Sequence, residues 1–265
     1  CLLCFLSIGI LYGLYAFIVP WITEYNPEEN TVILESGPMN LLPADRDYSI
    51  LSWNIGYAGL GGEMDFFYEG GRMTRPEEQQ SQKYLAGITA FLEMNDSIDF
   101  MFIQEVDFRS KRSYRVDQYM AIQGTLAEYH GVSATNYKSA FVPSPALAPM
   151  GKVHAGLATF GRHSAANATR VSTPGSYAWP MRLFMLKRCF LVSRYRVGDG
   201  RFLVLFNIHN SAFDDAAGLR DQELQLLRKL AMEEYEKGNY VVIGGDWNQN
   251  PPGWEPRTAV KYQVK

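Results

Sequence analysis

The chain has 265 residues, of which 47% are hydrophobic and 20% are charged, so it can bury a sizeable core and is not expected to be disordered. Its formal net charge is −3, and this lack of a basic excess argues against a protein whose main partner is a nucleic-acid backbone. The three cysteines have spacings that exclude a disulfide framework and a zinc site.

The first predicted element is an apolar run over residues 1–23 that contains no charged residue. A membrane-spanning helix needs about 20 apolar residues, whereas the apolar region of a cleaved signal peptide has only about 7–15. The run therefore predicts a single transmembrane anchor, with a cleaved signal peptide as the alternative. Acidic residues follow it, and the first basic residue is Arg46, so the rest of the chain is expected on the non-cytoplasmic side of the membrane.

Residues 24–46 are polar and rich in turn-forming residues, which predicts a linker. Apolar strands and amphipathic helices then alternate along the chain. The pattern predicts strands over Tyr48–Ile55, Ile98–Val106, Thr135–Val142, Ala155–Gly161, Arg182–Val197, Arg201–His209 and Tyr240–Gly245, and helices from Pro76, over Asp117–Tyr129 and over Asp215–Lys237. Because the strands between residues 135 and 209 follow one another as hairpins would, we expect two packed mixed β-sheets with helices outside them.

Polar side chains stand at the ends of four of these strands. They are Asn54, Glu105, Asn207 with His209, and Asp246 with Asn248. A carboxylate after an apolar strand is costly to bury unless it is paired or binds a cation. Because open α/β sheets bind ligands at the carboxyl ends of their strands, we expect one site that contains Asn54, Glu105, His209, Asp246 and Asn248. Each residue alone also has an ordinary structural explanation, such as a turn, an ion pair or a core histidine.

A basic segment over residues 107–115 follows Glu105 directly. This segment can approach a phosphate-bearing substrate, and Arg112 is its candidate contact. A solvated loop is the alternative interpretation.

Four motifs occur in order along the chain: Ser52-Trp53-Asn54-Ile55, Ile103-Gln104-Glu105-Val106-Asp107, Asn207-Ile208-His209 and Gly245-Asp246-Trp247-Asn248. They resemble the successive motifs of the endonuclease/exonuclease/phosphatase superfamily, which includes deoxyribonuclease I, and they span residues 48–253. The resemblance implies a four-layer α/β sandwich. It also implies hydrolysis of a phosphate ester by a phosphodiesterase, phosphatase or nuclease.

The resemblance assigns a role to each matched residue. Glu105, with Asn54 beside it, would ligate a divalent metal ion, Mg²⁺ or alternatively Mn²⁺. Asp246 would orient and deprotonate the attacking water, while Asn248 would hydrogen-bond the phosphoryl group. His209 would stabilise charge on the phosphoryl oxygens.

The same resemblance makes Asn207 a candidate substrate-binding residue beside Asn54 and Arg112. The family ends with an Asp-His pair, and no such pair follows Asn248, so the domain over residues 47–265 is expected to be incomplete at its C-terminus. The expected substrate is a lipid, small-molecule or nucleic-acid phosphate ester, and the expected state is a monomer held at the membrane by its N-terminal helix. The alternative is a catalytically inactive, membrane-anchored binding module on the same fold.

Overall fold

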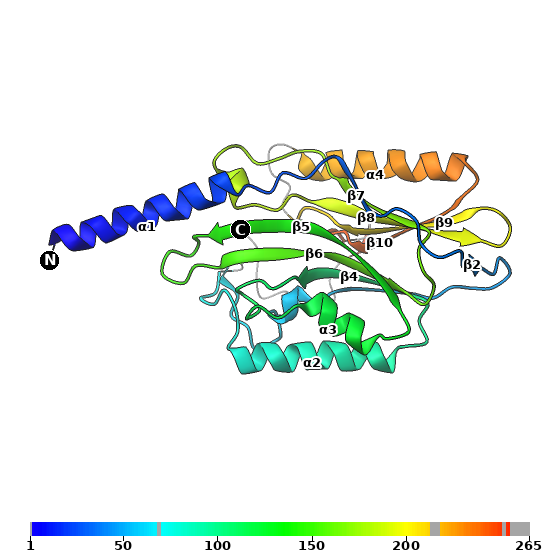
Figure 1. The fold of residues 1–265 in the computed structure, drawn as a ribbon, viewed down its shortest axis with the longest axis horizontal. Coiled ribbons are helices and arrows are strands. Elements are labelled where there is room, and N and C mark those ends of the chain that lie inside the picture. Colours follow the sequence, from blue (N-terminus) through cyan, green and yellow to red (C-terminus); the bar gives the residue numbers. More distant parts are fainter. Residues whose placement is uncertain (1, 68–69, 213–217, 251–252, 255–265) are drawn as a thin grey trace.

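Two mixed β-sheets pack face to face in the middle of the domain, with helices outside them (Figure 1). The computed structural model describes residues 2–67, 70–212, 218–250 and 253–254. Within these residues, six strands form the first sheet in the order β1-β7-β8-β9-β10, with β2 paired to β8, and four form the second in the order β3-β4-β6-β5. The first sheet contains β1 (Asn30–Leu34), β2 (Leu41–Leu42), β7 (Asn167–Ser172), β8 (Cys189–Val197), β9 (Phe202–His209) and β10 (Tyr240–Asp246). The second contains β3 (Ile50–Asn54), β4 (Phe100–Asp107), β5 (His130–Val142) and β6 (Gly151–Gly161).

Helices complete two further layers. α2 (Glu78–Met94) and α3 (Gln118–Thr125) cover the outer face of the second sheet, and α4 (Leu219–Glu236) covers the first (Figure 1). Parallel and antiparallel pairs occur in both sheets, since β9 and β10 run parallel, as do β3 and β4, while the hairpins are antiparallel. This arrangement confirms the predicted α/β fold with two mixed sheets flanked by helices.

Strand β4 shows why its sequence is apolar without interruption. Successive side chains of a strand point to opposite faces. Phe100 and Phe102 therefore face the first sheet, where the ring of Phe100 lies 4.9 Å from that of Tyr195. Met101 and Ile103 face α2 and α3. All four β4 side chains are fully buried, so the strand is covered on both sides.

Some element boundaries differ from the prediction. The strand expected from Arg182 begins only at Cys189, and residues 181–183 form a short 3-10 turn instead. The backbone oxygens of Leu183 and Phe184 accept hydrogen bonds from the hydroxyls of Ser139 and Tyr137, so this apolar stretch packs as a loop. Residues 215–217, where the last helix is expected to begin, lie outside the described residues.

The segment predicted as a linker, residues 24–46, is part of the first sheet. Its strand β1 pairs with β7 and its strand β2 pairs with β8. Leu42 is 1% exposed and belongs to the core between the sheets. The prediction missed these strands because a two-residue strand and a turn-rich sequence carry almost no periodicity.

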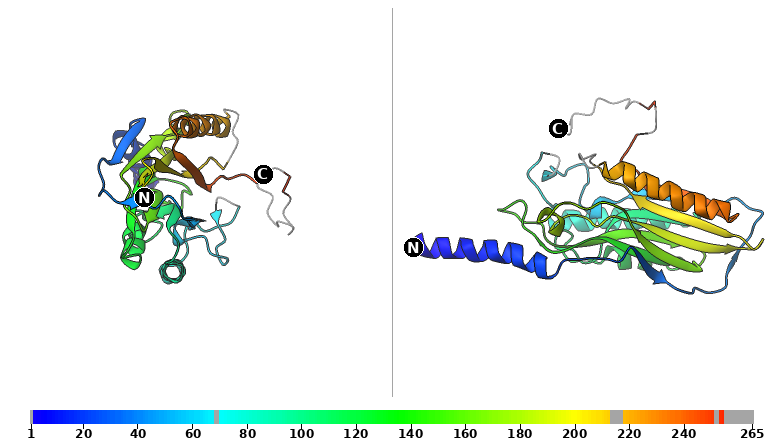
Figure 2. Two further views of the ribbon diagram at one scale, coloured as in Figure 1. Left: turned by 90° about the vertical axis from the view of Figure 1, so that its right-hand side faces the viewer. Right: turned by 90° about the horizontal axis from the view of Figure 1, so that it is seen from above.

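The apolar N-terminal run forms the helix α1 (Leu2–Ile22), which extends away from the sheets (Figures 1 and 2). Among the described residues, no helix is long and apolar enough to cross a membrane. The expectation of a transmembrane helix is therefore not supported. In the second half of the helix, Tyr12 and Tyr15 contact the ring of Phe141, and Phe17 contacts Trp179. The predicted side of the membrane stays a prediction.

Candidate active site

The polar residues at the strand ends do meet, as the sequence predicts. β9 and β10 are parallel and end together, with Asp246 opposite His209, and β3 ends with Asn54 opposite Gln104 of β4. Between the two sheets, the Asn54 Nδ2 donates to Glu105 Oε1 at 3.1 Å and to Asp246 Oδ2 at 2.8 Å. One amide thus joins carboxylates from both sheets. We call Asn54, Glu105, His209, Asp246 and Asn248 the strand-end cluster.

Glu105 reaches the cluster through an irregularity in β4. The pairing of β4 with β6 shifts register between Ile103 and Val106, and Glu105 has a φ of 56°. A positive φ is uncommon for a residue with a side chain and costs conformational energy. The bulge turns this carboxylate out of the regular alternation, so that its side chain is 26% exposed beside buried neighbours. Such local strain is concentrated at functional sites.

Asp246 and Asn248 are fixed by the turn that ends β10. The backbone nitrogen of Asn248 donates to Asp246 Oδ1 at 2.9 Å, and its Nδ2 donates to the backbone oxygen of Asn210 at 2.8 Å. Gly245 has a φ of 137°, and a Cβ there would collide with the backbone oxygen of Ile208. The glycine before Asp246 is therefore required by the close approach of two parallel strands.

His209 lies between the two carboxylates without bonding either. Its Nε2 is 3.9 Å from Glu105 Oε1 and 3.8 Å from Asp246 Oδ2, which is too long for a hydrogen bond. Its Nδ1 is buried and has no hydrogen-bond partner among the described residues. Burial and the positive charge of Arg188 hold the pKa of His209 well below its ordinary value, although Asp246 opposes them. The imidazole is therefore neutral near pH 7 and can donate one hydrogen bond.

Two residues predicted to contact substrate lie elsewhere. Asn207 is fully buried, where its Oδ1 accepts from Gln104 Nε2 at 2.8 Å and its Nδ2 donates to the backbone oxygen of Ala158 at 2.8 Å. It connects the two sheets below the cluster. The prediction for Asn207 is therefore wrong, because its polar atoms are already bonded inside the protein.

Arg112 is also buried rather than available to a substrate. Its Nε and Nη2 donate to Asp107 at 3.1 Å and 2.9 Å, and its guanidinium lies 3.8 Å from the centre of the Tyr57 ring. Although burial acts against it, Asp107 raises the pKa of Arg112 above its ordinary value. The predicted substrate contact is corrected to an internal ion pair.

Arg188 is a cation near the cluster that the sequence pattern missed. Its Nη1 donates to the backbone oxygen of His209 at 2.8 Å. Burial lowers the pKa of its guanidinium, while the negative charges of Glu223, Glu105 and Asp246 act in the opposite direction. Arg188 directly precedes β8, which is antiparallel to β9, so the beginning of β8 shares an edge with the end of β9. A search for polar residues after strands does not find it.

The donor set of the cluster agrees with a divalent cation. Glu105 and Asp246 both contact one neutral amide, and the histidine near them is neutral, so nothing inside the cluster balances two carboxylate charges. Among the described residues, no group of three or more histidine, cysteine, aspartate and glutamate side chains is arranged to hold a metal. Mg²⁺ does not require one, because it binds through one or two carboxylates together with waters and substrate phosphates.

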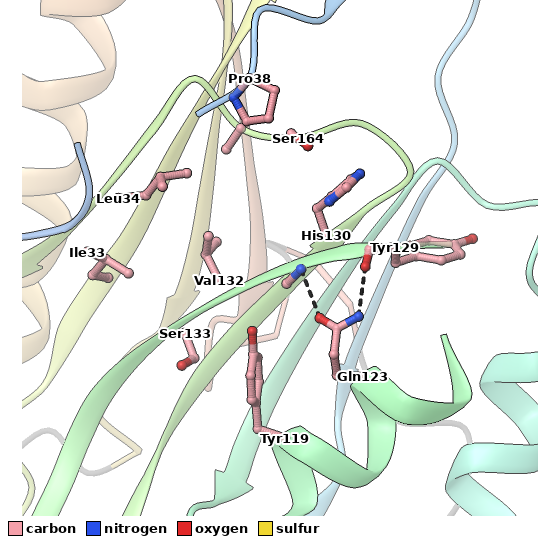
Figure 3. A pocket seen from close by; sticks show the side chains of 12 residues that line it. Ile33, Leu34, Pro38, Tyr119, Gln123, Tyr129, His130, Val132, Ser133 and Ser164 are labelled. Carbon is pink, nitrogen blue, oxygen red and sulfur yellow. Dashed lines mark hydrogen bonds between the residues drawn. The ribbon is translucent and has the colours of Figure 1, made fainter. Parts of the chain in front are cut away.

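A larger cavity of about 590 Å³ lies far from this cluster (Figure 3). It is next to His130, where β5 begins; His130 pairs with Gly161 at the end of β6, and Gly161 pairs with Phe100 at the beginning of β4. Figure 3 shows Tyr119, Ile33 and Val132 around it. The cluster lies at the other end of β4, so this cavity is not part of it.

Comparison with solved structures finds the same fold. ANGEL2, a 2',3'-cyclic phosphatase, is 17% identical, with 86% of this chain and 58% of that chain covered and a TM-score of 0.51. The complex of ANGEL2 with adenosine-2',3'-vanadate is 18% identical, with 77% of this chain and 54% of that chain covered and a TM-score of 0.50. The human Nocturnin catalytic domain with bound sulfate anion is 18% identical, with 77% of this chain and 66% of that chain covered and a TM-score of 0.49. At these identities the likeness to the two ANGEL2 structures shows the fold alone. This chain spans about two thirds or less of each of the three solved chains.

No curated protein matches the chain. The sequence model of the Endonuclease/Exonuclease/phosphatase family matches residues 51–264, which include the whole strand-end cluster. The match covers most of the chain and agrees with the four-layer fold. The chain therefore belongs to the Endonuclease/Exonuclease/phosphatase family.

Proposed function

We propose that the protein hydrolyses a phosphate ester in a reaction that depends on Mg²⁺. The observation that carries the proposal is the Asn54 amide, which holds the carboxylates of Glu105 and Asp246 together at the ends of strands from two sheets. Two carboxylates this close repel each other unless a cation or a hydrogen-bond donor lies between them. The family match supports phosphoester chemistry at this position.

The residues divide the work as follows. Glu105, with Asn54 beside it, would hold the metal ion, which when bound supplies positive charge to the phosphoryl oxygens. Asp246 accepts a proton from water as the water oxygen bonds to phosphorus, and the bond from phosphorus to the leaving oxygen breaks. Asp246 is held for this by Asn54 and by the backbone of Asn248, and each of its oxygens keeps a free lone pair.

Neutral His209 and charged Arg188 act on the substrate side. The imidazole has a single N–H to donate, and a neutral donor suits an anionic phosphoryl oxygen without changing the net charge of the cluster. Arg188 adds a positive charge behind His209 through its bond to the His209 backbone. The net charge of −3 gives no support to a nucleic-acid backbone as the main partner, so a lipid or small-molecule phosphate ester is favoured over DNA.

Replacing Glu105 with Gln tests the metal site. The change removes one negative charge and preserves the shape of the side chain. Changes in groups that merely surround a metal ligand cost about 10–100-fold in metal affinity, so loss of a ligand charge should raise the half-saturating Mg²⁺ concentration at least that much. The measurement is hydrolysis of a panel of phosphate mono- and diesters during Mg²⁺ titration after chelation, with Mg²⁺ binding followed by calorimetry.

The matched control is Glu93→Gln, which changes an exposed glutamate at the end of α2, away from the cluster. This variant should bind Mg²⁺ as the unchanged protein does. If Glu105→Gln unfolds the protein or leaves the Mg²⁺ dependence unaltered, Glu105 is structural and the metal site is misplaced. Phosphate binding without hydrolysis would instead support the binding module on the same fold.

A further inference from the structure

A polar pocket shares Arg188 with the surroundings of the strand-end cluster. It has a volume of about 180 Å³, which is room for several water molecules at roughly 30 Å³ each. Three cations line it from one segment, Arg182, Lys187 and Arg188. We call it the Lys187 pocket. The loop after β7 and the residues that follow α1 form its other walls and include Ser172, Thr173, Ser176, Glu24 and Asn26.

The pocket has an excess of positive charge. Glu24 is the one acidic residue among the described residues that line it, and its Oε1 lies 3.2 Å from both Lys187 Nζ and Arg182 Nε. Among the described residues that line the pocket, three cations stand against one carboxylate, while Glu223, Glu105 and Asp246 also act on Arg188 from outside the lining. Lys187 and Glu24 have side chains that are 16% and 14% exposed, so water screens their charges only in part. An anion entering the pocket would meet Lys187 and Arg182, which share the single carboxylate of Glu24.

Arg188 connects the pocket to the cluster. It lines the pocket, and its Nη1 donates to the backbone oxygen of His209, where its charge acts on His209. The same guanidinium is close enough to Glu105 and Asp246 for their charges to affect its pKa. A substrate with its reacting phosphate at the cluster would therefore have a second cationic subsite beside it.

We propose that the Lys187 pocket binds a second phosphate group of the substrate. The preferred substrate is then a bisphosphorylated small molecule or lipid headgroup, in which one phosphate ester is cleaved and the other is held. The inference rests on the proposed phosphoesterase function. A guanidinium presents a planar set of donors to phosphate oxygens, an ammonium adds a mobile donor, and the hydroxyls of Thr173 and Ser176 can donate to the remaining oxygens.

The test compares substrates that differ by one phosphate. The probes are alkanediol bisphosphates of increasing chain length, the matching alkyl monophosphates, and monophosphates that carry a carboxylate in place of the second phosphate. Selectivity is the ratio of kcat/KM for the bisphosphate to that for the monophosphate. A hydrogen bond to a charged group is worth about 1.5–3 kcal/mol, so Lys187→Gln should lower this selectivity by roughly 10–100-fold.

A second variant should change the selectivity in the opposite direction. Glu24→Gln removes the carboxylate that competes for Lys187 and Arg182, and it should raise the selectivity for the bisphosphate. The matched control is Lys229→Gln on the exposed face of α4, where Lys229 pairs with Glu233, and it should leave the selectivity unaltered. Calorimetry with each bisphosphate supplies a readout that does not need turnover.

The two proposals fail in different ways. Hydrolysis of both substrates with equal kcat/KM, and no effect of Lys187→Gln or Glu24→Gln, would overturn the second-phosphate pocket while the phosphoesterase function stands. No hydrolysis of any ester would overturn the function, and calorimetry would then decide the pocket: equal binding of bisphosphate and monophosphate overturns it. If the carboxylate-bearing monophosphate had the same kcat/KM as the bisphosphate, the pocket would not be a phosphate site.

Discussion

Replacing Asp246 with Asn should lower kcat for phosphate-ester hydrolysis by about 10²–10⁴-fold, the usual cost of losing a general base. The change keeps the shape of the side chain but removes its ability to accept a proton from water. KM should change far less, because Glu105 and Asn248 remain in place. The measurement is steady-state kinetics of the purified variant with a substrate that the unchanged protein hydrolyses.

The hydrogen bonds of Asp246 set a limit on how the result is interpreted. Asp246 accepts from Asn54 Nδ2 and from the backbone of Asn248 with its two different oxygens, and an asparagine has only one oxygen. The variant therefore loses one hydrogen bond, worth about 0.5–1.5 kcal/mol of stability. A thermal melt separates that loss from catalysis. Asp45→Asn, an exposed change before β3 and so at the opposite end of that strand, is the matched control.

Two kinetic outcomes would contradict the mechanism. A near-normal kcat for Asp246→Asn would show that another group deprotonates the water. A raised KM with an unchanged kcat would make Asp246 a binding residue, since uniform loss of binding acts on KM alone. In either case the carboxylates would still need a cation or Asn54 between them.

The strand-end cluster was predictable because its signal is local. Asn54, His209 and Asp246 are the last residues of their strands and Glu105 lies near the end of β4, and parallel strands bring their carboxyl ends to one edge. The contacts within the cluster were not predictable. That Asn54 bonds carboxylates of both sheets depends on how the sheets pack, and the register shift that turns Glu105 outward depends on β6.

The residues assigned wrongly show what a sequence leaves out. Asn207 and Arg112 are polar and lie close to the motifs, which is all that the sequence displays. Whether a polar group faces a substrate or an internal partner is decided by distant residues such as Ala158 for Asn207 and Tyr57 for Arg112. Arg188 is the reverse case, since it lies before a strand and becomes part of the site only through antiparallel pairing with β9.

The Arg112–Asp107 ion pair should be the most sensitive point for stability near the site. Asp107 is fully buried, and Arg112 is its cationic partner. Removing one member of a buried ion pair leaves an uncompensated charge and costs about 3–5 kcal/mol. Arg112→Met should therefore lower the free energy of unfolding by about that amount, with a further loss from the cation–π contact on Tyr57. Urea unfolding of the full chain measures the difference.

Through Tyr57, the pair also connects the segment after Glu105 to the segment after Asn54. Loss of the pair should therefore also displace Asn54 and Glu105 in the cluster. The backbone oxygen of Tyr57 accepts from Gln118 Nε2 at 2.6 Å, and Gln118 Oε1 accepts from the backbone of Asp107 at 3.0 Å.

Arg109→Met is the matched control, because Arg109 pairs with Asp117 while its side chain is 72% exposed, and such a surface pair is worth about 0–1 kcal/mol. The double change Arg112→Met with Asp107→Leu removes both charges and should recover much of the lost stability. Equal losses for Arg112→Met and Arg109→Met, or a double variant less stable than either single one, would show that the pair does not hold these segments together by charge.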